Sequence, residues 1–362
     1  MDQAKIENLN PYHVIGLVLN TCIGVNLLML SHSVSAMGYN QWWLPFILGV
    51  LVTLTLYPMN ALCSRYPDDS LYVINEKLLG KWLGRLVNIL VIAYATLNVA
   101  AANSGYVRLA QTSMLSNETV TLPLLGLSLV MIYITNGGIK LVARFCLISF
   151  FFTGWMVYLL QWGYIKGGIM HIFPLFNTTL SDVLHALHQS STSMFGYELL
   201  LFYYPFIQKK SKALRDALIG VWLVVAFYVV ILLTSVAYFS VWEMEHLIYP
   251  ILNLFKAVEL SFLERMENLG VGLWVFLVLS TSTAYLWVAR RGIEEWSGKR
   301  KWWHLLLPAT IAYFMIRGPL PLQFQQFLFD KVNVYMGYTV ILWPVFLLLV
   351  HAVRSRSGGE AA

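Results

Sequence analysis

The stretch STSMFGYELLLFYYP (Ser191–Pro205) places a glycine and a carboxylic acid in the middle of an otherwise apolar segment of membrane-spanning length. A charged side chain at the centre of a transmembrane helix costs about 2.5 to 3.5 kcal/mol on insertion scales, so such residues usually face the bundle interior and have a function. Gly196 is poorly suited to hold a helix at that point. The stretch therefore predicts a broken helix. Glu198 either lines a ligand cavity there, or only stabilises the break by staying protonated or by accepting bonds from freed backbone donors.

The composition predicts a polytopic membrane protein. Of the 362 residues, 58% are hydrophobic and only 12% are charged, whereas about a quarter of the residues of a soluble globular protein are charged. Tryptophans such as Trp42 and Trp302 lie near the ends of apolar runs, where their amphipathic rings favour the headgroup zone. The three cysteines, Cys22, Cys63 and Cys146, are odd in number and lack metal-ligand spacing, which excludes a disulfide framework and a zinc site.

Ten apolar stretches are long enough to cross a bilayer, whose core of about 30 Å needs about 20 residues per helix. They cover residues 12–37, 42–63, 83–109, 119–135, 141–164, 182–207, 217–241, 268–289, 302–316 and 332–353. With a cytoplasmic N-terminus, the cytoplasmic segments hold most of the lysines and arginines, including the clusters in 209–215 and 290–301. The positive-inside rule then predicts that both termini are cytoplasmic. These basic clusters are interpreted as topology signals, and no nucleic-acid partner is expected.

Ten spans make two halves of five, and because five is odd the second half must be inverted relative to the first. Transporters with inverted repeats bind their ligand near the midplane, where the first helix of each half is broken. In LNTCIGVNLL (Leu19–Leu28), Gly24 lies about as far into the first span as Gly196 lies into the sixth. The sequence thus predicts an all-α integral membrane fold in a single transmembrane domain over 1–362. Its repeats would cover about 12–165 and 182–353, with broken first and sixth helices.

One long connection, 242–268, lies outside the membrane in this topology. Apolar residues recur in it at helical spacing, with charged residues between them. The segment is too charged to span the bilayer. It predicts an amphipathic helix that lies in the outer interface or caps the bundle.

Sequence motifs of enzymes are missing. There is no Walker A lysine motif, no nucleophile elbow and no H-E-x-x-H pair. His185 and His188 are spaced to approach each other near the outer mouth of the sixth span, but no third ligand is evident, so we expect no metal site. The chain is therefore not expected to be an enzyme or to hold a cofactor.

Polar residues in two other spans point to the same region. In LSTSTAYLW (Leu279–Trp287), hydroxyls including Ser280 and Thr281 lie at about mid-depth. With carbonyls freed around Cys22 to Val25 they could form a sodium site. The favoured alternative is that they bond their own i−4 carbonyls and pack closely. In the third span, Tyr94 and Asn98 indicate a wet or hydrogen-bonded face.

Three stretches resemble the endospore germination B-subunit family, whose members are distant relatives of amino-acid permeases. They are LLGKWLG (Leu78–Gly84), FGYELLLFYYPFIQKK (Phe195–Lys210) and YPILNLFKAVELSFLERME (Tyr249–Glu267), and the similarity extends over essentially the whole chain. The resemblance implies a LeuT-like fold and residence in the inner membrane of a dormant spore. It also implies assembly with an A and a C subunit into a nutrient receptor, surrounded by membrane lipid.

The resemblance further implies that a germinant, an amino acid or a sugar, binds between the first, third, sixth and eighth helices. The candidate ligand-binding residues are Cys22, Ile23, Gly24, Val25, Tyr94, Asn98, Phe195, Gly196, Tyr197, Glu198, Ser280 and Thr281. The leading hypothesis is a germinant-binding subunit that signals to its partners, since a ligand shifts a conformational equilibrium by its differential affinity for the two states. The alternative is a secondary transporter that carries an amino acid with Na⁺ or H⁺. An ion-conducting pore is a weaker third hypothesis, because no ring of repeated acidic or carbonyl motifs is visible.

Overall fold

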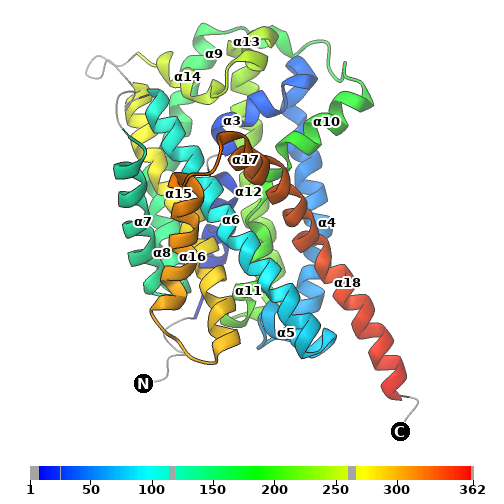
Figure 1. Cartoon of the computed structure of the whole chain (residues 1–362). Coiled ribbons are helices and arrows are strands. Elements are labelled where there is room, and N and C mark those ends of the chain that lie inside the picture. The colour runs from blue at the N-terminus through cyan, green and yellow to red at the C-terminus, as the bar shows by residue number, and fades with distance from the viewer. Residues whose placement is uncertain (1–7, 25, 114–118, 260–265, 360–362) are drawn as a thin grey trace.

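Helices make up most of the part of the chain that the computed structural model describes, which covers residues 8–24, 26–113, 119–259 and 266–359. Within these ranges the only β pairing is an isolated parallel bridge between Leu9 and Ile207. Long helices pack side by side, and the beginning of α2 and the end of α18 lie at the same end of the bundle (Figure 1). The all-α membrane fold predicted from the sequence is therefore confirmed.

Each of the ten predicted spans corresponds to helical elements. In chain order they are α2 (Pro11–Ile23) with α3 (Asn26–Ser33); η1 (Ser35–Trp43) with α4 (Leu44–Arg65); α6 (Lys81–Ser113); α7 (Thr121–Asn136); α8 (Ile139–Gly154) with η2 (Trp155–Leu160) and α9 (Gln161–Lys166); α10 (Leu180–Ser190) with η4 (Ser191–Met194), η5 (Tyr197–Leu199), α11 (Leu200–Tyr203) and η6 (Tyr204–Phe206); α12 (Ala213–Tyr238); α15 (Met266–Ser297); α16 (Trp303–Arg317); and α17 (Leu322–Gln326) with η8 (Phe327–Val332) and α18 (Asn333–Gly359). Shorter elements are α5 (Leu71–Leu79), η3 (Ile169–Ile172), η7 (Lys210–Lys212), α13 (Val241–His246) and α14 (Pro250–Lys256).

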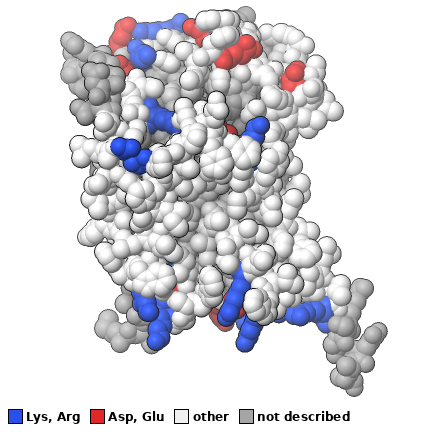
Figure 2. All heavy atoms as spheres, in the orientation of Figure 1, with Lys and Arg blue, Asp and Glu red and all other residues white. Residues whose placement is uncertain are grey.

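Among the described residues, six helical stretches are long and apolar enough to cross a membrane, and the bent pair α2 and α3 would make a seventh. The other three predicted spans are the shorter helices α7 and α16, with 16 and 15 residues, and the broken sixth span. Large apolar side chains such as Leu54 and Leu129 are about 60% exposed on the outside of the bundle. Figure 2 shows that Lys, Arg, Asp and Glu gather toward the two ends of the visible face and leave its middle almost free of charge. This distribution is that of a multi-pass membrane protein.

Helix α15 is the most enclosed of the long helices. It packs against α6, α8, α7, α16 and α2, and 72% of its apolar window is buried. A helix that is apolar on all sides can be buried on all sides. Its small and hydroxylated residues, Ser280 to Ala284, are all buried, and Thr281 lies against the first break, where its Oγ1 is 3.2 Å from the position that a Cβ of Gly24 would take.

Both predicted helix breaks are present, so the expectation of broken first and sixth helices is confirmed. Helix α2 ends at Ile23, Gly24 has φ +36°, and α3 restarts at Asn26 with a bend of 54°. Gly196 has φ +126°, and a Cβ there would lie 2.7 Å from the backbone carbonyl carbon of Thr21. Only glycine combines that φ with so close an approach of the chain. The first and sixth spans thus touch at their breaks.

The exterior segment expected as one amphipathic helix over 242–268 differs from that expectation. It contains two short helices, α13 and α14, and residues 266–268 already belong to α15, while 260–265 lie outside the described residues. Pro250 at the first turn of α14 explains the interruption, because proline lacks an N–H and disfavours a helical residue before it. Ile251 and Phe255 are buried against the bundle, and α14 contacts α3 and α15, so this segment caps the bundle.

Candidate functional site

A cavity of about 880 Å³ lies where the two breaks meet. Residues from α2, α3, α6, α10, η4, α15 and η8 line it, so its walls come from helices far apart in the sequence. It extends toward the end of the bundle that carries α13 and α14, because Gln111, Thr112, Ile248 and Tyr249 also line it. Its volume is in the range of small-molecule sites.

The candidate residues divide into two groups. The residues that line the cavity are Cys22, Gly24, Asn98, Phe195 and Thr281. The residues that lie close by but do not line it are Ile23, Tyr94, Gly196, Tyr197, Glu198 and Ser280. Val25 lies outside the described residues. The structure therefore brings the first, third, sixth and eighth spans together at one cavity and places the predicted carboxylate behind its wall.

Glu198 is fully buried and accepts three hydrogen bonds. The hydroxyls of Tyr94 and Tyr285 donate to its Oε1 at 2.8 and 2.6 Å, and the backbone N–H of Gly196 donates to its Oε2 at 2.7 Å. This geometry corresponds to the alternative in which Glu198 stabilises the broken backbone. Because Tyr285 itself lines the cavity, one tyrosine ring connects Glu198 with the cavity wall.

Carbonyls freed by the breaks accept hydrogen bonds from side chains. The hydroxyl of Tyr228 lies 2.6 Å from the oxygen of Ser193 and 3.1 Å from that of Cys22, so one side chain on α12 bridges both broken spans. The indole N–H of Trp274 donates to Gly24 O at 3.0 Å. Buried backbone acceptors are costly if left unpaired, and these donors pair them.

The hydroxyls of α15 mainly bond within their own helix and to its neighbours. Ser280 donates to Phe276 O at 2.8 Å, and Thr281 Oγ1 lies 3.2 Å from Leu277 O. Thr281 Oγ1 also lies 3.3 and 3.4 Å from the carbonyl oxygens of Asn20 and Thr21. This pattern corresponds to back-bonding and close packing. In the described ranges, no three His, Cys, Asp or Glu side chains gather as a metal site.

Several polar cavity residues, among them Asn333, Arg108 and Asp330, were missed by the sequence reasoning. Asn333 forms a reciprocal amide pair with the predicted Asn98, with distances of 2.9 and 3.1 Å, that joins α18 to α6. Arg108 on α6 and Asp330 on η8 also line the cavity. Arg108 lies one residue before the predicted end of the third span. The sequence reasoning therefore counted it among the charged residues beside the membrane and not among the binding residues. Asp330 lies on a π-helical turn, and no simple sequence pattern predicts such a turn.

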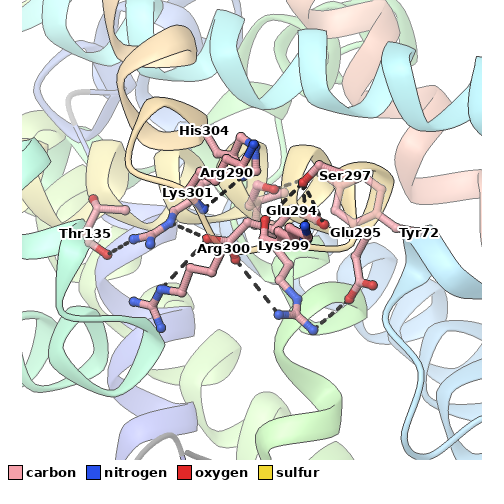
Figure 3. A network of polar contacts seen from close by, with 12 residues as sticks. Tyr72, Thr135, Arg290, Glu294, Glu295, Ser297, Lys299, Arg300, Lys301 and His304 are labelled. Atoms are coloured by element: carbon pink, nitrogen blue, oxygen red, sulfur yellow. Dashed lines mark hydrogen bonds and ion pairs between the residues drawn. The ribbon is translucent and has the colours of Figure 1, made fainter.

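At the other end of the bundle, polar contacts hold α15 against α7 (Figure 3). Arg290 is 4% exposed; its Nε donates to Glu294 at 2.7 Å and its Nη1 to Thr135 O at 3.3 Å. Arg300, in the loop after α15, donates to Asn136 O at 3.1 Å. Charged side chains are rarely this buried unless they are paired, so the network stabilises one arrangement of these helix ends.

The start of the first span and the end of the sixth span are joined at this same end. The Leu9 N–H donates to Phe206 O at 2.8 Å, and the Gln208 N–H donates to Leu9 O at 3.1 Å. The Arg291 guanidinium lies 5.6 Å from the centroid of the Phe206 ring, which is a cation–π contact. The two broken spans are thus held together at their ends as well as at their breaks.

Comparison with known proteins agrees with this architecture. In the solved structure titled "Crystal structure of MhsT in complex with L-phenylalanine", the fold matches with a TM-score of 0.67 at 16% identity, over 91% of this chain and 87% of that one. MhsT is a LeuT-fold transporter. The likeness confirms the LeuT-like fold.

Curated relatives match over most of their length. The chain is 26% identical over 322 residues to spore germination protein GerQB of Bacillus cereus, covering 87% of this chain and 88% of that protein. It is 25% identical over 359 residues to spore germination protein A2 of Bacillus subtilis (strain 168), covering 96% of each. These relatives and the fold neighbour are not enzymes, which confirms that expectation. A family model described as "Spore germination protein" matches residues 8–319, and the chain therefore belongs to the spore germination protein family.

Proposed function

We propose that this chain is the nutrient-binding membrane subunit of a spore germination receptor and that its germinant, an amino acid or a sugar, binds in the cavity at the two helix breaks. The observation that carries the proposal is the cavity itself, which is bounded by both breaks and by polar side chains from five different spans. Paired helix breaks at the midplane are where inverted-repeat carriers hold their ligands.

The contacts around the breaks offer a route from ligand binding to a change of conformation. A ligand against Tyr285 meets a side chain that also donates to Glu198, and Glu198 in turn accepts from the Gly196 N–H. Tyr228 connects that break to the first one. A ligand that alters any of these bonds has a different affinity for the two arrangements of the broken spans, which is the requirement for a signal.

In this proposal the ends of the chain face the cytoplasm, in the inner membrane of the spore, and the chain assembles with A and C subunits. The segments at the end of the bundle where α2 begins and α18 ends, such as 209–215 and 290–301, hold many of the lysines and arginines of the chain, in line with the positive-inside rule. The contacts of Arg290 and Arg300 lie at this end. A network that holds helix ends on the cytoplasmic side is suited to respond to partner subunits there. The two inverted repeats, 12–165 and 182–353, are the units whose relative movement would carry the signal.

Spores that lack this gene test the proposal against a panel of single amino acids and sugars. Germination, followed as loss of optical density, should fail for one nutrient or a small group of nutrients and return with a wild-type copy. If the purified protein binds no nutrient of the panel and the spores germinate normally on all of them, the proposal is wrong. Ion-dependent uptake of an amino acid by the protein alone in liposomes would favour the transporter alternative instead.

A further inference from the structure

The cavity contains one strong cation and one carboxylate. Among the described residues that line it, Arg108 on α6 and Asp330 on η8 are the only Lys, Arg, Asp or Glu residues, and His32, His185 and His188 line it as well. Both side chains belong to the lining of the same cavity, yet the two form no ion pair with each other in the described part of the chain. Two opposite charges that share a cavity without pairing leave room for a molecule that carries both.

Arg108 is held in place by a buried amide. The side chain of Gln325 is 7% exposed, and its Nε2 donates to Ile316 O at 3.2 Å and to Leu320 O at 3.4 Å. These bonds fix the orientation of the amide, so that its Oε1 is the atom that accepts from Nη2 of Arg108 at 3.2 Å. A guanidinium has five N–H donors in a rigid fork, and one contact to Gln325 leaves enough of them for a bidentate carboxylate.

Asp330 is presented by an irregular turn. Residues Phe327–Val332 form a π-helix before the α-helix of α18 begins, and such turns occur frequently at functional sites. The side chains of Phe329, Asp330 and Asn333 from this region all line the cavity. Asp330 accepts no hydrogen bond from the described residues, so its carboxylate is available to a ligand donor.

We infer that the ligand of the cavity is a zwitterion, a free α-amino acid, whose carboxylate binds Arg108 and whose ammonium group binds Asp330. This inference rests on the proposed function and chooses between its two nutrient classes. A neutral sugar would bind beside both charges without neutralising either, whereas an amino acid pairs each with its opposite. Charge-assisted hydrogen bonds are the strong ones in such a site, and they also exclude analogues that lack one of the charges.

The test measures binding to the purified full-length protein in detergent by calorimetry. The probes are the proteinogenic L-amino acids, a panel of neutral sugars, and, for the amino acid that binds best, its amide and its N-acetyl derivative. We expect the wild type to bind the amino acid and to bind both derivatives tenfold to a hundredfold more weakly, in keeping with the loss of one charged hydrogen-bond pair. Arg108→Gln should weaken binding of the amino acid to a similar extent and remove the preference over the amide. Asp330→Asn should remove the preference over the N-acetyl derivative.

Matched variants separate this role from a general effect on the fold. Arg317→Gln and Glu245→Gln remove charges on the same side of the bundle that do not line the cavity, and both should bind like the wild type. Arg108→Lys retains the charge without the fork and should give intermediate affinity if Arg108→Gln is poorly folded. Binding of a neutral sugar, unaffected by either cavity variant, would overturn the zwitterion inference and leave the proposed function intact. No binding of any probe, with normal germination of the deletion spores, would overturn both.

Discussion

Glu198 is the residue that stands out most clearly in the sequence, and its hydrogen bonds lead to a first prediction. Glu198→Gln keeps the side-chain volume but replaces one accepting oxygen by an N–H₂ group, which must face either the Gly196 N–H or the hydroxyls of Tyr94 and Tyr285. In either orientation a buried donor loses its acceptor, so we expect a loss of about 1–3 kcal/mol in the free energy of unfolding. Thermal unfolding in detergent measures this loss, and germination of spores that carry the variant should require more nutrient.

Tyr285→Phe is the matched control for that variant. It removes one donor to Glu198 while leaving the Gly196 bond in place. A smaller loss of stability is expected, because the carboxylate keeps two of its three donors. If Glu198→Gln unfolds at the wild-type temperature and its spores respond normally, Glu198 has neither the bracing nor the signalling role.

Gly196 gives a second prediction at the residue scale. Gly196→Ala places a Cβ 2.7 Å from the Thr21 carbonyl carbon on a backbone with φ +126°, which an L-residue rarely adopts. Strain and overlap together should cost about 2 kcal/mol or more. The measurement is again thermal unfolding, with Gly272→Ala as the control, since a Cβ at Gly272 meets nothing within 4 Å. Equal unfolding temperatures for the two variants would contradict the close contact between the broken spans.

At this scale the sequence predicted unusual residues better than their roles. Glycine and glutamate stand out inside an apolar segment, so Gly196 and Glu198 could be found without a structure. Which way Glu198 points depends on Tyr94 and Tyr285, which come from helices about a hundred and about ninety residues away. No local pattern contains such pairings.

Among the elements, α12 supports both breaks through one hydroxyl. Tyr228→Phe leaves the oxygens of Cys22 and Ser193 without this donor while keeping the buried ring. We expect a loss of about 1–3 kcal/mol in the free energy of unfolding and a weaker nutrient response, because buried carbonyls lose a partner at the point where the spans meet. Tyr133→Phe, at a tyrosine that is 79% exposed on α7, serves as the control in the same unfolding experiment. A neutral effect of Tyr228→Phe would mean that the breaks are held together without it.

The elements also show where sequence periodicity is insufficient. Long apolar runs predict α4, α6, α12 and α15 because length and hydropathy suffice in a bilayer. The prediction of a single helix in the exterior segment was wrong, because Pro250 interrupts the helix although apolar residues recur at helical spacing on both sides of it. The sequence did not predict the π-helical turn η8, because such a turn changes the register of a helix without any change of composition. As a result the tenth span, which supplies Asp330 and Asn333, was absent from the candidate site.

For the whole molecule, the inverted arrangement could be anticipated by counting, because ten spans divide into two odd halves. The count gives the order of the helices but not the cavity that results from it. Arg108, Asn98, Asn333 and Asp330 meet only when α6 and the tenth span pack together, and the amide pair of Asn98 and Asn333 is one of the contacts between them. The fold followed from the sequence, whereas the polar lining required the packed bundle.

The last prediction concerns ion coupling of the whole molecule. A bound Na⁺ needs several oxygen ligands, and carbonyls at the breaks are the natural source in this architecture. Here the Cys22 and Ser193 oxygens accept from Tyr228, and Gly24 O accepts from Trp274. An ion at these oxygens would compete with the buried donors that already bond them, and a donor that loses its acceptor is costly. We therefore expect nutrient affinity in sodium chloride and in choline chloride to agree within about twofold, which corresponds to a negligible coupling free energy.

Calorimetric titration of the purified protein measures both affinities, and potassium chloride at the same concentration controls for ionic strength. Affinity that rises tenfold or more in sodium alone would overturn this prediction and favour a sodium-coupled carrier.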